Sequence, residues 1–235
     1  MNLNLRTKGI FLVIIGTMLW GISGTVAQFL FQNKGFSPEW LVVIRLLSSG
    51  TILLLYGYIS SDNDIKIIWK SKNNRISLFL FSILGMLGVQ YTYFAAISHG
   101  NAATATILQY LSPVIITCYL IVKNKKLPTL KQMFAIILAM VGTFFIITRG
   151  NIHSLSLSKL ALFWGISSAI CSAIYTLQPI SLLKQFSSTA VVGWGMLIGG
   201  LFFSFIHSPF KFVGTWSLSS VLSLIFIIVF GTVIA

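Results

Sequence analysis

Hydrophobic residues form eight long runs along the chain, and short polar islands separate them. Most of these runs have about 18 residues or more, which is the length a helix needs to cross roughly 30 Å of hydrocarbon. They are continuous rather than alternating, so the pattern predicts membrane-spanning helices and not the strands of a barrel. The fifth and seventh runs show the pattern least clearly. The expected spans are residues 10–31, 40–59, 76–97, 102–122, 132–148, 160–182, 190–207 and 217–235.

Composition agrees with this pattern. The 235 residues are 56% hydrophobic and only 8% charged, with a mean hydropathy of +0.93, whereas soluble domains are about a quarter charged. The sequence therefore predicts an all-α integral membrane protein.

The net charge is +13, and the positions of the charged residues along the chain are informative. The cations alternate from loop to loop instead of forming one patch, which argues against a nucleic-acid partner and indicates membrane topology. With the N-terminus inside, eleven cations are cytoplasmic and four are outside, and Arg45 lies within a span. We therefore expect a multi-pass protein of the cytoplasmic membrane, with its cations attracted to anionic lipid. The cytoplasmic set is Arg6, Lys8, Lys66, Lys70, Lys72, Arg75, Lys123, Lys125, Lys126, Lys131 and Lys184, and the outer set is Lys34, Arg149, Lys159 and Lys211.

A short motif in the first span recurs in the sixth. Trp-Gly-Ile-Ser at residues 20–23 is repeated at 164–167, an offset of 144 residues (164 minus 20). Two weaker matches follow in the same order, and chance recurrence of tryptophan, glycine and serine in apolar helices is the alternative explanation. These matches align residues 36–50 with 186–200 and residues 84–92 with 227–235.

Five spans precede the second copy, and this odd number would invert it in the membrane. Inverted repeats are the architecture of secondary transporters, in which two similar halves open a central site to each side in turn. The predicted units are a five-helix repeat at 8–148, a connecting loop at 149–157 and an incomplete repeat at 158–235. Because residue 235 aligns only with the third span of the first repeat, we expect a truncated form of a ten-span protein roughly 60 residues longer.

Taken together, these residues resemble the EamA-type permeases of the drug/metabolite transporter superfamily. The resemblance covers essentially the whole chain, although members often carry a glutamate after the fourth span, where this chain has KNKKLPT with Lys126. It implies transport of small organic solutes, often the export of amino acids and their derivatives, without a cofactor. The motifs that carry it are Trp20-Gly21, Trp164-Gly165, Arg45 in IRLLSSG, YFAAISHGNAATATILQYLSPV up to Pro113, and Gly142.

Polar side chains follow one helical face in several spans, as a solute site at the centre of the membrane would require. In the fourth span four residues fall at i, i+3, i+4 and i+7, a single stripe on a regular helix. The sixth span carries a similar stripe, and the first and third spans add two residues each. The candidate substrate-binding residues are Trp20, Ser23, Gln90, Tyr93, Thr106, Gln109, Tyr110, Pro113, Trp164, Ser168, Ser172 and Tyr175.

Helix packing is the competing interpretation of these residues. The packing interpretation is favoured for Ser23, Ser168 and Ser172, since serines hydrogen-bond across close helix contacts. Gln109 is balanced between packing and substrate binding, because a buried amide needs partners for two donors and an acceptor. Pro113 frees the carbonyl of Gln109, which could face a neighbouring helix or the solute.

For three further sets of residues, a structural role is preferred to a functional one. Arg45 is expected to snorkel to the outer headgroups, with anion binding as the second interpretation. His99 is expected to be a solvated loop residue rather than a proton carrier. Trp40, Trp69 and Trp216 lie at predicted membrane boundaries and are expected to be interfacial anchors.

The most economical function is a secondary transporter of small metabolites that works by alternating access. The chain has three acidic residues and no GxxxxGK[ST] motif, so neither a buried carboxylate nor direct use of ATP is indicated. Its two cysteines and three histidines suggest no metal site or disulfide. The alternatives are a membrane-embedded enzyme, which needs acids, metal ligands or an activated nucleophile, and a channel or non-transporting sensor. A homodimer is compatible with the sequence.

Overall fold

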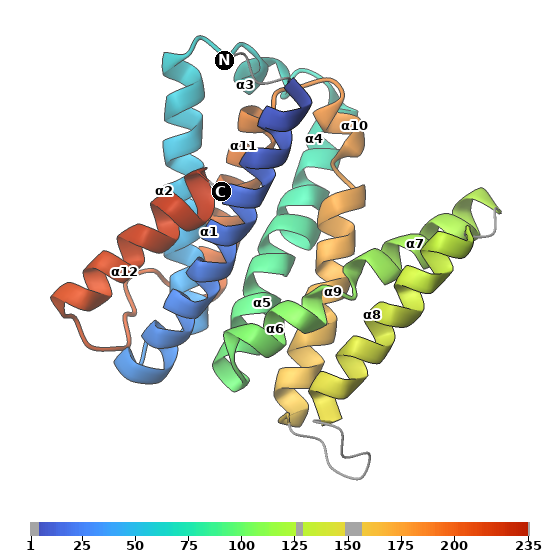
Figure 1. The fold of residues 1–235 in the computed structure, drawn as a ribbon. Coiled ribbons are helices and arrows are strands. Elements are labelled where there is room, and N and C mark those ends of the chain that lie inside the picture. Colours follow the sequence, from blue (N-terminus) through green and yellow to red (C-terminus); the bar gives the residue numbers. More distant parts are fainter. Residues whose placement is uncertain (1–4, 126–128, 149–156, 235) are drawn as a thin grey trace.

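The protein is a bundle of membrane-length helices (Figure 1). The computed structural model describes residues 5–125, 129–148 and 157–234. The predicted loop at 149–157 lies outside the described residues except for position 157, and so does Lys126. The elements are α1 (Leu5–Lys34), α2 (Pro38–Ile59), α3 (Asp64–Ile67), α4 (Lys72–Leu80), η1 (Phe81–Leu87), α5 (Gly88–His99), α6 (Ala102–Gln109), α7 (Ser112–Asn124), α8 (Leu130–Thr148), α9 (Lys159–Leu177), α10 (Ile180–Leu183), α11 (Ser188–Ile206), α12 (Leu218–Ile228) and η2 (Val229–Ile234), where η1 and η2 are π-helical.

Each of the eight predicted spans corresponds to a helix or to a run of joined helices. Six are long and apolar enough to cross a membrane, and within the described residues the apolar parts of the fifth and eighth are shorter. The seventh run, which the sequence pattern showed weakly, forms the complete helix α11. These helices establish an all-α, multi-pass membrane protein.

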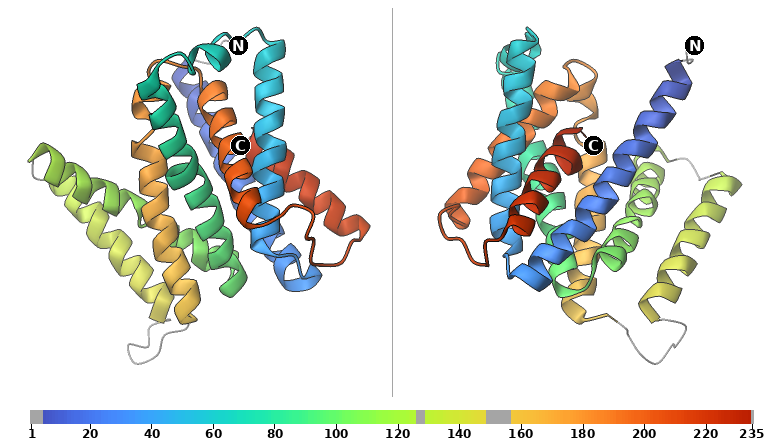
Figure 2. Two further views of the ribbon diagram at one scale, coloured as in Figure 1. Left: turned by 180° about the vertical axis from the view of Figure 1, so that it is seen from behind. Right: turned by 60° about the vertical axis from the view of Figure 1, so that its left-hand side comes forward.

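Successive spans run in opposite directions, as short connections require (Figures 1 and 2). Helix α1 descends from the end of the molecule that carries the α2–α3–α4 connection, whereas α9, which carries the repeated motif, ascends towards that end. The second copy of the motif is therefore inverted relative to the first. Most of the lysines that the sequence assigns to the cytoplasm lie at the end with the α2–α3–α4 connection, and we call it the lysine-rich end.

Helices α2 and α11 form the closest contact in the bundle, and the contact is reciprocal. A Cβ atom added to Gly50 would lie 2.7 Å from the backbone nitrogen of Leu197, and one added to Gly200 would lie 3.0 Å from that of Leu47. Gly200 and Leu197 lie 150 residues after Gly50 and Leu47, which is the offset found in the sequence. The two contacts are therefore counterparts of each other. A two-fold axis between inverted repeats produces such contacts. They favour a true repeat over chance recurrence, and the repeat boundaries themselves stay a prediction.

The third and eighth spans share an irregularity. Each contains a π-helical segment, η1 in the third and η2 in the eighth, and each packs closely on the span that carries a copy of the motif. A Cβ atom at Gly88 would lie 3.1 Å from Sγ of Cys171 on α9. One at Gly231, its counterpart in the sequence alignment, would collide with the side chain of Ser23 on α1.

Two tryptophans brace the connections at opposite ends of the α2–α11 pair. The indole nitrogen of Trp40 donates to the carbonyl of Pro209, beyond the end of α11, at 2.8 Å. That of Trp194 donates to the carbonyl of Ile65, beyond the end of α2, at 2.9 Å. The expectation that Trp40 anchors in the lipid interface is wrong: it is 6% exposed and packs edge-on against Phe212. Trp216 is half exposed and lies beside the same cluster.

The lysine-rich end carries a second clamp. Ser187 caps the N-terminus of α11, and its hydroxyl also donates to Oδ2 of Asp62 at 2.5 Å. Its backbone N–H donates to Oδ2 of Asp64 at 2.7 Å. Two carboxylates therefore sit at the positive end of a helix dipole and tie the α2–α3 connection to α11.

Helices α7 and α8 form a hairpin that leans away from the rest of the bundle (Figures 1 and 2). Helix α8 packs against α6 and α7, and most of its described side chains are exposed. A single helix with this exposure would be unstable in water, but an apolar surface suits a position that faces lipid.

Candidate functional site

Tyr93 is the centre of the first group of candidate residues. It is 2% exposed, and its ring stacks on that of Trp20 with centroids 5.2 Å apart. Its hydroxyl is 2.8 Å from Oγ1 of Thr106, whose own proton can go to the carbonyl of Ala102. A Cβ atom at Gly24 would come within 2.5 Å of the Tyr93 hydroxyl. Residues of α1, α5 and α6, from three different spans, therefore build one aromatic and hydroxyl cluster.

Gln109 and Ser168 form the second group. The amide nitrogen of Gln109 donates to the hydroxyl of Ser168 at 2.7 Å, and both side chains are buried. Next to them, α6 and α9 approach closely because Gly165 leaves room for Leu108, which occupies the space of a missing side chain. This hydrogen bond joins the fourth span to the sixth across the boundary between the predicted repeats.

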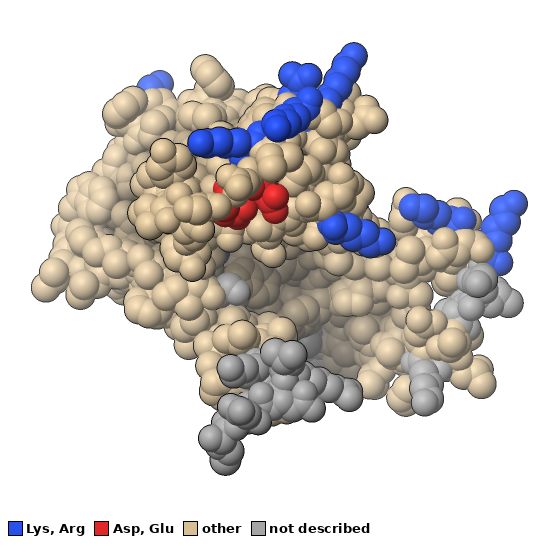
Figure 3. Space-filling model, turned by 90° about the horizontal axis from the view of Figure 1, so that it is seen from above, with Lys and Arg blue, Asp and Glu red and all other residues tan. Residues whose placement is uncertain are grey.

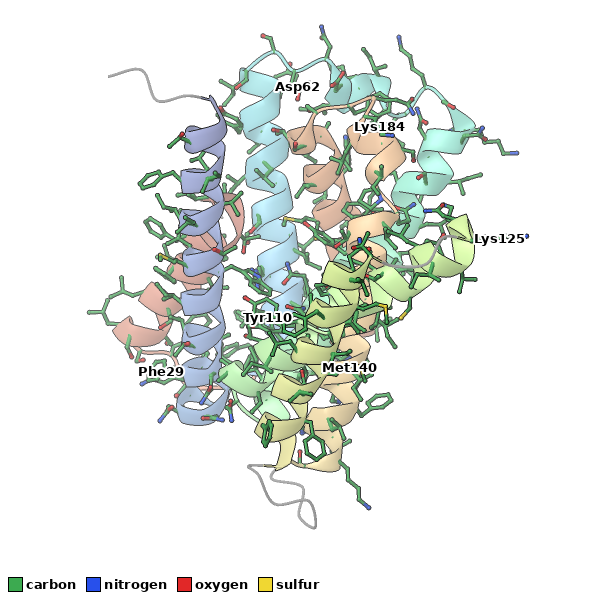
Figure 4. All side chains as sticks on the ribbon, turned by 45° about the vertical axis from the view of Figure 1, so that its right-hand side comes forward. Phe29, Asp62, Tyr110, Lys125, Met140 and Lys184 are labelled. Atoms are coloured by element: carbon green, nitrogen blue, oxygen red, sulfur yellow. The ribbon has the colours of Figure 1, made fainter. Side chains whose placement is uncertain are left out.

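The stripe predicted along the fourth span is not continuous. Helix α6 ends at Gln109 and α7 begins at Ser112, so the residues on either side of this break do not share one helical face. The cause is Pro113, which sits in the first turn of α7, where its missing N–H costs nothing. As a result Tyr110, labelled in Figure 4, is 60% exposed and Pro113 is exposed, while Gln109 is buried and Thr106 is half buried.

A third group contains Trp164, which the sequence predicts, and Tyr91, which it does not. Trp164 packs edge-on against Tyr91 with ring centroids 5.3 Å apart, and Tyr91 also contacts Phe203 on α11. The hydroxyl of Tyr91 donates to Oε1 of Glu39 at 3.4 Å. Tyr91 has no polar neighbour three or four residues away in the sequence to mark it, and its role follows from its ring contacts with Trp164 and Phe203. It links the acid at the end of α2 to the interior.

The remaining candidates are dispersed among these groups. Tyr175 lies against the ring of Phe81 at 5.6 Å, and Gln90 and Ser172 are half buried. Ser23 is 1% exposed, and its hydroxyl has no hydrogen-bond partner among the described residues. It faces η2 rather than the Tyr93 cluster, which agrees with the packing role that serines favour.

The expectation that Arg45 snorkels to the headgroups is wrong. It is 1% exposed, and its guanidinium donates from Nε to Oγ1 of Thr232 at 2.6 Å and from Nη2 to the carbonyl of Gly231 at 2.8 Å. It also lies over the ring of Phe94 at 5.1 Å. The π-helical turn of η2 makes these acceptors available, because wider turns leave carbonyls outside the regular ladder. Arg45 therefore fastens the third and eighth spans to α2. His99 is exposed, as the sequence predicts.

The chemistry of this interior is hydrogen bonding and aromatic contact. Among the described residues, no group of three or more histidine, cysteine or acidic side chains could hold a metal ion. The three groups offer aromatic faces, hydroxyls and one amide, all positioned on membrane helices. Such surroundings can bind a small polar molecule through several short-range contacts.

This architecture defines a class: a multi-pass helical membrane protein with inverted copies of one motif and hydrogen-bonded polar residues buried between its helices. The model of the EamA-like transporter family matches residues 7–148. The chain therefore belongs to the EamA-like transporter family and is a membrane transporter.

Known relatives agree with this membership. The chain is 39% identical over 229 residues to the uncharacterized inner membrane transporter YicL of Salmonella typhimurium, covering 96% of this chain and 75% of that protein. It is 23% identical over 135 residues to the uncharacterized transporter YyaM of Bacillus subtilis, covering 55% of this chain and 43% of that protein. A protein of known crystal structure has the same fold, with a TM-score of 0.61 at 14% identity, covering 95% of this chain and 75% of the other.

Proposed function

We propose that this protein is a secondary transporter that exports small organic metabolites, amino acids or related amines, by alternating access across the cytoplasmic membrane. The observation that carries the proposal is the pair of buried polar contacts Tyr93–Thr106 and Gln109–Ser168. Buried polar groups within a membrane are costly, so residues of this kind commonly mark a substrate path. A neutral or zwitterionic solute suits hydroxyls, an amide and aromatic faces.

The two contacts suggest how a solute would enter. In the described conformation the polar groups satisfy one another, and a solute would have to replace these hydrogen bonds with its own. The reciprocal crossing of α2 and α11 at Gly50 and Gly200 supports a rocking motion of one half against the other. We assign the lysine-rich end to the cytoplasm from the charge distribution. The name of the Salmonella relative, an inner membrane transporter, supports the cytoplasmic membrane as the location.

An enzyme or a channel is less well supported. The described interior offers no cluster of acids or metal ligands with which catalysis could begin. A channel would conduct without saturation, whereas a carrier with a defined site saturates and shows counterflow.

The first test is transport by the protein reconstituted in liposomes. Proteoliposomes loaded with an unlabelled amino acid or amine should accumulate the same labelled compound by counterflow, and the initial rate should saturate. In cells, expression should enrich one class of amino acids or amines in the medium. Linear flux without counterflow would contradict a carrier, and unchanged pools of all these compounds would contradict their export.

Tyr93→Phe tests the site itself. The variant keeps the stacking on Trp20 and removes the hydroxyl that meets Thr106. A net hydrogen bond is worth about 1 kcal/mol, so its loss should raise the KM for the solute about fivefold. We expect counterflow to show this change. Tyr56→Phe is the matched control, because Tyr56 lies on α2 and is 63% exposed. Equal transport by the two variants would contradict the assignment of Tyr93.

A further inference from the structure

A groove opens between the α7–α8 hairpin and the end of the sixth span. The fourth and sixth spans touch near the middle of the bundle through Gln109 and Ser168, and α7 then leans away towards the lysine-rich end. The space between α7 and the α9–α10 segment is about 660 Å³. Figure 3, which views the lysine-rich end, shows a hollow there with basic side chains on both sides.

The rim of this groove is basic and polar. Lys123 on α7 and Lys184 at the end of α10 line it from opposite sides, and Gln178, Ser181 and Gln185 also line it. No acidic residue is among its lining residues, and neither lysine has an ion-pair partner among the residues that the structure describes. Figure 4 shows Lys184 at the lysine-rich end and Lys125, which follows α7, at the tip of the hairpin that leans away from the bundle. Two cations without counterions therefore face a shared space.

The inner walls of the groove are apolar. Tyr119, Leu120 and Leu177 line them, and Nζ of Lys123 lies 5.5 Å from the ring centroid of Tyr119. Lys123 and Lys184 come at the ends of their spans, next to Asn124 and Leu183, where a membrane helix reaches the headgroup layer. The groove thus has cations at headgroup depth above a hydrophobic wall, and a free anion would use only the rim.

We propose that this groove binds an anionic phospholipid. The phosphodiester of the headgroup would lie between Lys123 and Lys184, and one acyl chain would follow the apolar wall towards the membrane centre. Anionic lipid is concentrated in the cytoplasmic leaflet, and basic pockets between membrane helices on that side match its headgroups. The site is separate from the buried polar groups assigned to transport, so it stands without the proposed substrate.

Native mass spectrometry of the purified full chain tests the site, with phosphatidylglycerol as the probe and phosphatidylcholine as the neutral comparison. The Lys123→Gln/Lys184→Gln variant should retain phosphatidylglycerol about 30-fold less well, since each lysine near anionic lipid is worth about a factor of five. The Lys123→Arg/Lys184→Arg variant should retain it, because both charges remain. Lys66→Gln/Lys70→Gln is the matched control: it removes the same charge at the same end from two exposed lysines outside the groove.

Retention that requires Lys123 and Lys184, and not Lys66 and Lys70, would support the lipid site. Three results would overturn it. Equal loss in both glutamine pairs would mean attraction by surface charge alone. Equal retention of phosphatidylcholine would mean that charge plays no part. Displacement of phosphatidylglycerol by an excess of glycerol 3-phosphate would identify a site for a soluble anion.

Discussion

Single residues decide how closely the helices of this protein approach one another. Gly50 and Gly200 bring the backbones of α2 and α11 together, and Gly24 makes room for the hydroxyl of Tyr93. In lipid no hydrophobic effect drives helices together, so close packing and hydrogen bonds between them must do so. Small residues therefore position the larger ones, such as Tyr93, that carry the chemistry.

Gly50→Ala tests this where an added Cβ atom would lie nearest to the backbone of a neighbouring helix. The new methyl group would lie 2.7 Å from a backbone nitrogen that cannot move independently, so we expect a destabilisation of about 1–3 kcal/mol. A fall in the melting temperature of the purified protein would measure it, and Gly200→Ala should behave similarly. Gly142→Ala is the control, because a Cβ atom there meets nothing within 4 Å. A Gly50→Ala protein as stable as the control would contradict the described crossing.

At the scale of elements, the informative helices are the interrupted ones. The third and eighth spans contain π-helical turns, and the fourth breaks between α6 and α7. Two of these interruptions lie beside buried polar side chains: Arg45 donates to η2, and the break follows Gln109 directly. Irregular backbone is tolerated at membrane depth only where side chains or neighbouring helices satisfy it.

The clamp on α11 gives a prediction at this scale. Ser187→Ala removes the cap of the helix and the bond to Asp62, which we expect to cost about 1 kcal/mol. Chemical unfolding in detergent would measure the loss. Ser37→Ala removes the cap of α2, where no carboxylate clamp is described, so it should cost less. A greater loss for Ser37→Ala would contradict the contribution of the two aspartates.

For the whole molecule, the decisive property is orientation. Most of the lysines and arginines that the structure describes lie towards one end, and a bias of this kind sets the direction of insertion. Inverted copies of one motif are the architecture on which the proposed alternating access would rest.

Orientation can be measured with single cysteines in a variant whose two native cysteines are replaced by serine. We expect Lys211→Cys to react with a membrane-impermeant maleimide added to intact cells. Lys66→Cys should react only after the cells are opened, because the lysine-rich end is assigned to the cytoplasm. The reverse pattern would show that the protein inserts the other way and would change the proposed direction of transport.

Much of the architecture could be predicted from the sequence, because the bilayer leaves the chain few choices. A long apolar run must form a helix to satisfy its backbone, and the charges between runs bias the orientation. The motif at Trp20 and Trp164 indicated an inverted repeat because five spans, an odd number, precede the second copy. The family membership agrees with this prediction.

The site depended on contacts that no single helix encodes. A regular helix would place Tyr110 on one face with Thr106 and Pro113, and the break between α6 and α7 removes that alignment. The sequence predicts that Arg45 reaches the headgroups. In the structure its guanidinium instead donates to η2, almost two hundred residues later in the chain. The sequence by itself thus determined the spans and their inversion, since these follow from local hydrophobicity. Only the tertiary structure decided which polar residues meet, because that depends on helix crossings and irregular turns between distant segments.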